Sequence, residues 1–492
     1  MSFVSIILST LIPFIIRTLM RYQLGADYLG LNSLFLSIIG ILNTAELGIG
    51  SVIVFFLYKP IAENDHQKIE AVLKELRKMY RIIGGVILSV GLLILPFLPN
   101  LIKTGNPTGD TIYFYYLCFL LADGLRYFLC PEFITLSNAY QRNDLISFIS
   151  IISQLGSYVV QIIGVCVFHN YFIYTLSVLV ETLIVAVMRY YEKNRYFPDI
   201  HPQGNLEKTE KMDIRKRILA MIGHQLDERI ISSIDDIILS AWIGLTVVVV
   251  YDNYFYVTTA ITMFLSILYS APLGSIGNAL ATETKESNFN RFQNILFLNA
   301  FLVGWACCCM LCLYQNFMTL WMGDLRLGND MVILFCLYFY LAQMRRTVQL
   351  FKNAAGMWYN DRFKPYIAII VDLALDLILI PLIGYHGAIL SSIICVGLVE
   401  IPWESYVLFR DYFNGGIKNY YRQLAVFSSI NLLIIVVSYL LCDMLFATNT
   451  FISLLLRFLF CSAVSFGLYL LFYHRREEWR TWVSSIRRLL HH

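Results

Sequence analysis

KRILAMIGHQLDERIISSIDDIILSAWIGL, residues 216–245, is long and apolar enough to cross a membrane as an α-helix, because about 20 mostly apolar residues span a bilayer. The stretch nevertheless contains His224, Asp227, Glu228, Arg229, Asp235 and Asp236. Each ionisable group at bilayer depth costs about 2.5–3.5 kcal/mol on insertion scales. Such groups persist only where they face a wet cavity or one another, so we predict that this helix lines the interior of a membrane protein.

The helical phase aligns three of these groups. At about 100° per residue, His224, Glu228 and Asp235 fall in one stripe, with Asp227 at its edge. Ile231 also lies on the stripe, so the polar face is interrupted. Two interpretations stay open: the groups line a transport pathway, or they form a structural ion-pair network between membrane-spanning helices.

The composition is that of a polytopic membrane protein. Of the 492 residues, 58% are hydrophobic and 14% are charged, against about 25% charged in a soluble domain, and the mean hydropathy is +0.65. No Gly-rich phosphate loop or nucleic-acid-binding motif is present in the sequence, so we predict no nucleic-acid partner.

The eleven cysteines all lie in apolar runs. Cys309 and Cys312 have the CxxC spacing, but this is a weak metal signal without a second pair or a histidine nearby. We therefore interpret the cysteines as packing thiols and predict neither a metal nor a cofactor.

Fourteen segments are predicted to span the membrane. They lie near residues 2–22, 31–57, 80–99, 111–136, 145–168, 171–189, 216–243, 248–277, 294–314, 331–353, 365–384, 387–408, 423–443 and 450–473. With a cytoplasmic N-terminus, thirty of the 37 Lys and Arg residues fall in inner segments, and only Lys103 and Arg326 fall clearly in outer loops. Positive residues favour cytoplasmic loops, so we predict that both termini are cytoplasmic.

The longest polar segment divides six predicted spans from eight, which suggests a repeat of six-helix lobes. We predict an N-terminal lobe at 1–190, a cytoplasmic linker at 191–215, a second lobe at 216–410, two additional helices at 411–473 and a cytoplasmic tail at 474–492. The tail, with Trp479 and Trp482 on one face, is predicted to lie on the inner membrane surface, and so is the amphipathic segment 67–78.

Two arginines lie one turn apart on the first span. Arg17 and Arg21 share one face of that helix, and two like charges on an apolar face repel each other unless an anion lies between them. Because guanidinium groups match phosphate oxygens, we predict that this pair binds a phosphate or pyrophosphate.

Further charges recur at membrane depth in both halves. They are Glu46, Asp123, Arg126 and Glu181 in the first half, and Asp372 and Asp376 in the second. Asp123 and Arg126 are three residues apart on one helix and are predicted to pair, although Arg126 is also a candidate for anion binding. Two neighbouring buried carboxylates cannot both stay ionised, so the Asp372–Asp376 pair is predicted to hold a cation or a shared proton. Glu228 and Asp235 offer the same chemistry, with H⁺ or Na⁺ as the coupling ion.

Several segments resemble one family of membrane transporters in their order and spacing. They are LGADYLGLNSLF and AELGIG within 24–50, LYKPIAENDHQKI (57–69), GHQLDERIISSIDDIILSAWIGLTVVVVYDNY (223–254), SIGNALATE (275–283), LWMGD (320–324), AAGMWYNDRFKPYIAI (354–369), GYHGAI (384–389) and IPWESYVLF (401–409). Together they cover nearly the whole chain. They resemble polysaccharide-export flippases of the Wzx type, in the multidrug/oligosaccharidyl-lipid/polysaccharide (MOP) superfamily.

The resemblance implies a V-shaped, MATE-like fold of two six-helix lobes plus two helices, in the bacterial cytoplasmic membrane. It implies a flippase, not an enzyme, that moves undecaprenyl-pyrophosphate-linked oligosaccharide units to the outer leaflet for capsule, exopolysaccharide or O-antigen synthesis. Arg17 and Arg21 match cavity arginines of the family, and Asp235 matches its acidic position in the seventh span. Asp372 departs from the pattern, because Asn is usual there. The implied partners are the lipid-linked substrate, membrane lipid and other polysaccharide-assembly proteins.

Two other functions are weighed against this one. A cation-coupled multidrug exporter of the same superfamily needs acidic residues in the first lobe, which Glu46, Asp123 and Glu181 supply, but Arg17 and Arg21 argue against it. A membrane polymerase or ligase needs catalytic side chains on sizeable outer loops, and the longest outer segments, around 100–110 and 315–330, offer few.

Overall fold

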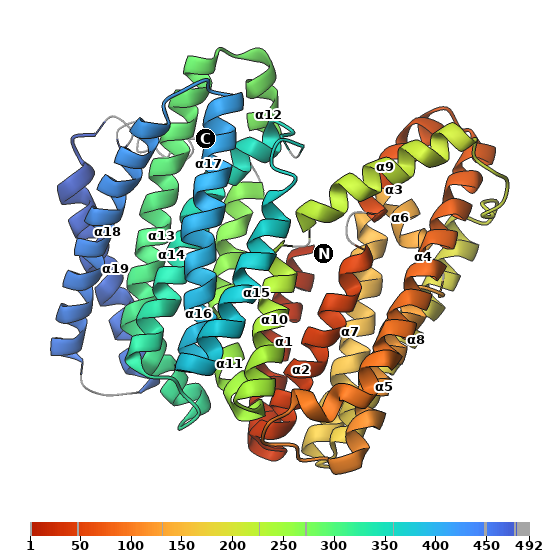
Figure 1. The fold of residues 1–492 in the computed structure, drawn as a ribbon, viewed down its shortest axis with the longest axis horizontal. Helices are drawn as coiled ribbons and strands as arrows, with labels where there is room; N and C mark the ends of the chain where they lie inside the picture. The colour runs from red at the N-terminus through yellow and green to blue at the C-terminus, as the bar shows by residue number, and fades with distance from the viewer. Residues whose placement is uncertain are drawn as a thin grey trace. The chain divides into compact units, whose positions relative to one another are not determined.

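The computed structural model describes residues 2–46, 49–129, 131–225, 227–270, 273–357, 359–446, 450–476 and 479. The described residues form helices and contain no strand (Figure 1). Ten of the described helices are long and apolar enough to cross a membrane. Each of the fourteen predicted spans coincides with one helix or with two or three consecutive helical segments, so the prediction of an all-α polytopic membrane fold is confirmed.

The chain divides into two compact units: unit 1 comprises Met1–Asp252 and Asp376–Gly384, and unit 2 comprises Asn253–Leu375 and Tyr385–His492. The helices of unit 1 are α1 (Ser2–Gln23), α2 (Ala26–Leu42), η1 (Asn43–Glu46), α3 (Ile49–Ala62), α4 (His66–Ile94), η2 (Leu95–Leu101), η3 (Gly109–Thr111), α5 (Ile112–Arg126), α6 (Glu132–Ala139), α7 (Asn143–Cys166), α8 (Tyr171–Tyr196), α9 (Lys208–Gln225) and α10 (Asp227–Trp242). The division into lobes at 191–215 stays a prediction.

Helices far apart in the sequence pack together in unit 1. Helix α7 packs along α8 and α1, α8 contacts α5, and α2 lies against α10. The close approach beside α2 requires a glycine: a Cβ added at Gly30 would lie 2.5 Å from the carbonyl oxygen of Leu245. Because Gly30 has no side chain, α2 packs directly against the backbone at Leu245, where α10 is joined to the next helix.

Among the described residues of unit 1, the second and the fourth predicted spans are interrupted in the middle. The second, predicted at 31–57, consists of α2, the 3₁₀ turn η1 and α3, and the fourth, predicted at 111–136, consists of α5 and α6. Pro131 stands directly before α6 and cannot continue a helix from α5 because it lacks a backbone N–H. Irregular backbone at membrane depth is tolerated only where protein covers it or where it lines a wet cavity.

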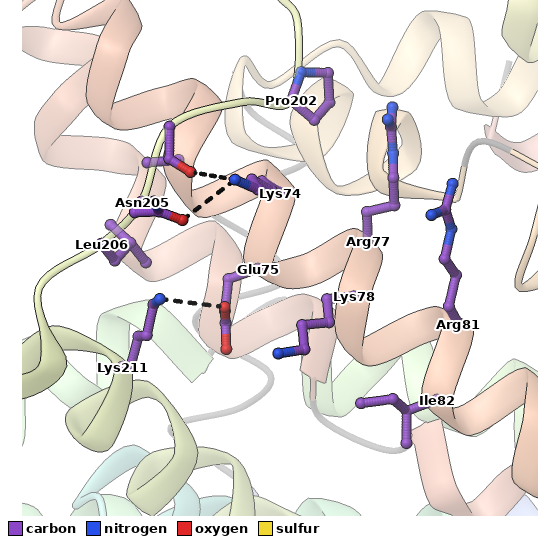
Figure 2. A pocket seen from close by; sticks show the side chains of 12 residues that line it. Lys74, Glu75, Arg77, Lys78, Arg81, Ile82, Pro202, Asn205, Leu206 and Lys211 are labelled. Atoms are coloured by element: carbon purple, nitrogen blue, oxygen red, sulfur yellow. Dashed lines mark hydrogen bonds and ion pairs between the residues drawn. The ribbon is translucent and has the colours of Figure 1, made fainter.

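The prediction that residues 67–78 form a helix on the inner membrane surface is wrong. These residues are the first part of α4, and their apolar face, including Ile69, Val72 and Leu76, is buried within the protein. The linker before α9 and the start of α9 both contact this part of α4 (Figure 2). Lys74 Nζ donates to Gly204 O of the linker at 2.7 Å, and Lys211 of α9 pairs with Glu75. The predicted surface helix of the tail 474–492 falls almost entirely outside the described residues.

Unit 2 is built around one long helix. Its helices are α12 (Leu273–Thr282), α13 (Lys285–Met322), α14 (Asn329–Ala354), α16 (Tyr385–Ile394), the π-helical segment η4 (Cys395–Glu400), α17 (Ile401–Asp411), α18 (Ile417–Leu445) and α19 (Phe451–Tyr473). Two further helices, α11 (Leu245–Ser270) and α15 (Lys364–Ile383), belong in part to each unit. Helix α13 contacts α14, α18 and α19. The two additional helices predicted at 411–473 are α18 and α19, and both pack against α13.

A buried network of charges joins α14, α15 and α17 in unit 2. Glu404 lies 3.1 Å from the Lys364 ammonium and 3.5 Å from both Arg345 and Lys352. Glu400 also pairs with Arg345, and lies 3.2 Å from Lys364. All five side chains are at most 5% exposed, so each charge depends on the others for compensation.

We expect Glu404→Gln to destabilise the protein by about 3–5 kcal/mol, because removal of one partner leaves buried cations uncompensated. Thermal unfolding of the purified protein in detergent measures the loss. Glu283→Gln is the matched control, since the ion pair of Glu283 with Arg291 is about one-third exposed and its loss should change little. An unchanged unfolding temperature for Glu404→Gln would show that the network does not stabilise unit 2.

Candidate functional site

A cavity of about 850 Å³ lies in unit 1 at the two interrupted spans. It is lined by Asn43, Glu46, Gly50, Ser51, Val54, Phe55, Tyr58, Tyr80, Asp123, Arg126, Tyr127, Pro131, Ile134, Thr135 and Asn138. The lining comes from η1 and α3, from α4, and from the junction of α5 with α6. Interrupted helices around a polar cavity are a recurrent way to build substrate sites in membrane transporters.

A chain of hydrogen bonds connects the two interruptions across this cavity. The Tyr127 hydroxyl lies 2.8 Å from Glu46 Oε2 and 2.9 Å from Asn43 Oδ1, and Asn43 Nδ2 donates to Asp123 Oδ1 at 2.9 Å. The other carboxylate oxygen of Asp123 is buried and has no hydrogen-bond partner in the described part of the chain. Since a buried acceptor without a donor is costly, Asp123 offers a place for a bound donor or cation.

The predicted pairing of Asp123 with Arg126 is not the contact that forms. Arg126 Nη2 lies 3.7 Å from Glu181 Oε1 of α8, and Arg126 Nε donates to Thr182 Oγ1 at 3.4 Å. The Arg126 side chain is 45% exposed, so much of the guanidinium still faces the cavity. Glu46, Asp123, Arg126 and Glu181, which were selected from the sequence, are therefore brought together at this one site.

A second polar cluster forms in unit 1 around Arg17. The guanidinium lies 3.8 Å from the Asp252 carboxylate, and Ser37 of α2 donates to Asp236 at 2.6 Å. The Asp236 and Asp252 carboxyl groups also lie close to each other. Asp235 accepts a hydrogen bond from Tyr251 at 3.3 Å.

The other residues selected from the sequence lie outside these contacts, or their side chains are not among those that the structure describes. Arg21 lies one turn after Arg17 on α1, 5.3 Å from the centre of the Tyr22 ring. Asp372 and Asp376 are one turn apart on α15 and fully buried. The side chains of His224, Asp227 and Glu228 fall outside the described part of the chain, so the predicted stripe stays a prediction.

Sequence reasoning missed three members of these sites: Asn43, Tyr127 and Asp252. The membrane-depth criterion that selected Asp235 would also have found Asp252, which lies in the apolar run VVVVYDNYFYV. Asn43 and Tyr127 carry no charge, and nothing in their local sequence separates them from other polar residues of apolar helices.

No protein-family model matches the chain, and no curated protein sequence matches it either. Among solved structures, it is similar to an inward-facing multidrug resistance MATE family transporter of the MOP superfamily, with a TM-score of 0.66, 13% identity, and coverage of 83% of this chain and 95% of the other. It is similar to the lipid II flippase MurJ in an inward closed conformation, with a TM-score of 0.66, 14% identity, and coverage of 96% and 98%. The fold is MATE-like. At these identities, the likeness shows the fold alone.

We expect Ser51→Trp to abolish most transport, because the indole would fill the cavity from an exposed position on α3 where folding tolerates a large side chain. Ser89→Trp is the matched control: Ser89 is an exposed residue of α4 that does not line the cavity. Both variants should reach the membrane in wild-type amounts. Full transport by Ser51→Trp would exclude this cavity from the substrate path.

Proposed function

We propose that the protein is a flippase that moves undecaprenyl-pyrophosphate-linked oligosaccharide units from the inner to the outer leaflet of a bacterial cytoplasmic membrane by alternating access. Surface polysaccharide synthesis would use the product. The observation that carries the proposal is the cavity of unit 1, at the two interrupted spans. The fold likeness to transporters, one of them a lipid II flippase, supports it.

The lining of this cavity suits a substrate rich in hydroxyl groups. Carboxylates, amides and hydroxyls offer acceptors and donors at many points around it, and Phe55 and Tyr58 add aromatic surface. The volume lies in the upper part of the usual range for small-molecule sites, which leaves room for sugar rings. Glu46 and Asp123 supply acceptors at bilayer depth for sugar hydroxyls.

Arg17 suits the anionic head group. One partner of Arg17 in the structure is Asp252, at 3.8 Å. A pyrophosphate group would compete with this carboxylate for the guanidinium. A substrate that binds Arg17 more tightly in one conformation shifts the equilibrium toward it, because a ligand shifts an equilibrium only by its differential affinity.

The alternative is a cation-coupled multidrug exporter of the same fold. The observation that favours it is the buried oxygen of Asp123 without a hydrogen-bond partner among the described residues, which suits a cation. Arg126 at the same cavity opposes it, because a cationic drug would meet a guanidinium. Increased sensitivity of knockout cells to cationic dyes, with normal surface polysaccharide, would favour the exporter.

We expect Arg17→Ala to lower export about 10- to 100-fold, because hydrogen bonds to a charged group contribute about 1.5–3 kcal/mol. Export is measured as surface polysaccharide against lipid-linked precursor left inside, in cells that hold equal amounts of each variant. The double variant Arg17→Ala/Asp252→Asn distinguishes substrate binding by Arg17 from neutralisation of Asp252 by Arg17. If Arg17 binds substrate, the double variant stays inactive. Restored export would mean that Arg17 only neutralises Asp252, and the head-group assignment would fail.

A further inference from the structure

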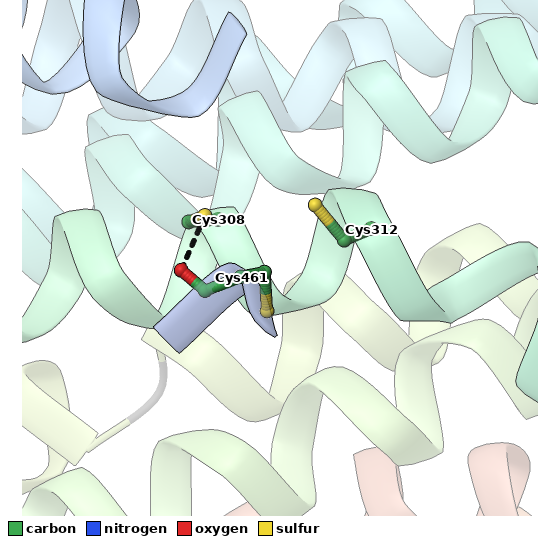
Figure 3. A group of neighbouring side chains, drawn as sticks. All are labelled: Cys308, Cys312 and Cys461. Carbon is green, nitrogen blue, oxygen red and sulfur yellow. Dashed lines mark hydrogen bonds between the residues drawn. The ribbon is translucent and has the colours of Figure 1, made fainter. Parts of the chain in front are cut away.

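Thiol groups from three helices of unit 2 gather at one point. Cys308 and Cys312 lie one turn apart on α13, Cys442 lies on α18 and Cys461 on α19. Figure 3 shows Cys308 and Cys312 beside Cys461, which lies 153 residues away from Cys308 in the sequence. All four are at most 4% exposed. We propose that this cluster binds a thiophilic d¹⁰ metal ion, Zn²⁺ or Cu⁺.

The sulfur positions fit such an ion. The Sγ atoms of Cys308, Cys312 and Cys461 all lie within 4.8 Å of one another. Cys442 of α18 packs in the same buried cluster and offers a fourth sulfur beside these three. A tetrahedral zinc site with bonds of about 2.3 Å places its sulfurs about 3.8 Å apart. Small side-chain rotations therefore close the cluster around an ion without moving the helices.

The neighbouring cysteines show that the clustering is specific to one face of α13. Cys307, the residue before Cys308, directs its thiol to the carbonyl of Cys336 at 3.7 Å. Cys309 lies at the edge of the cluster, with its sulfur 3.8 Å from that of Cys461. A preference for small apolar side chains would not by itself bring thiols from three helices to one point.

The surroundings supply charge compensation and a route of entry. Each coordinating thiol loses its proton when the ion binds, so the site becomes negative, and Arg457 supplies a positive charge one turn before Cys461 on α19 and beside Cys312 in the wall of one cavity. Cys312 also lines a mostly apolar cavity of about 660 Å³, to which Gln315, Asn316, Asp443 and Arg457 contribute polar groups. This cavity gives an ion a route to Cys312.

The bound ion would fasten α18 and α19 to α13. These are the two helices predicted beyond the six-helix repeat, and structural metal sites with four sulfur ligands contribute directly to folding. The site is separate from the cavity of unit 1, so metal content and polysaccharide export can be measured independently.

The test is the metal content of the full chain, purified in detergent without chelator and measured by mass spectrometry for zinc and copper. We expect about one ion per chain for the wild type and for Cys307→Ser, which is the matched control from the adjacent buried position. Cys308→Ser/Cys461→Ser should lose the ion and unfold at a lower temperature.

A second measurement needs no variant. Maleimide labelling of the wild type, mapped by peptide mass, should spare Cys308, Cys312, Cys442 and Cys461 until a chelator is added, and should then modify them. The proposal is overturned if the purified wild type holds no ion and takes up neither added Zn²⁺ nor added Cu⁺. It is also overturned if two of the four form a disulfide, or if Cys307→Ser loses the ion equally.

Discussion

A charge inside the apolar layer of a membrane needs an opposite charge or a polar environment within a few ångströms, and this requirement organises both units. In unit 1, Arg17 meets Asp252, and Arg126 meets Glu181. In unit 2, the carboxylate of Glu404 holds three cations from two other helices. Desolvation makes each partner expensive alone, so the charged residues determine which helices lie together.

The same requirement explains the interrupted helices. Where α2 gives way to η1, and where α5 ends before α6, backbone groups lose their helical partners and need others. Asn43, Glu46, Asp123 and Tyr127 form a connected polar network at these two points. A region that gathers polar side chains at two interrupted helices can also accept a polar substrate, which is why we place the substrate path there.

The need of buried charges for partners does not explain the thiol cluster, because each cysteine side chain is by itself compatible with an apolar interior. A single buried cysteine packs as a small hydrophobic residue. Three sulfurs from α13 and α19 that lie within 4.8 Å of one another, with Cys442 of α18 in the same cluster, can also act as a soft ligand set.

The amino-acid sequence by itself determined the class of protein, the fourteen helical segments and the presence of charges at bilayer depth, because hydropathy and segment length are local properties. It placed Glu46, Asp123, Arg126 and Glu181 among the candidates that the structure brings together. It predicted the wrong partner for Arg126 and a surface position for 67–78, and it did not predict that four cysteines from three helices gather in one cluster. Only the tertiary structure decided these points. Pairing depends on how each helix is rotated and on contacts between residues far apart in the sequence, 80 positions for Asn43 and Asp123 and 199 for Ser37 and Asp236, and no local pattern encodes such a distance.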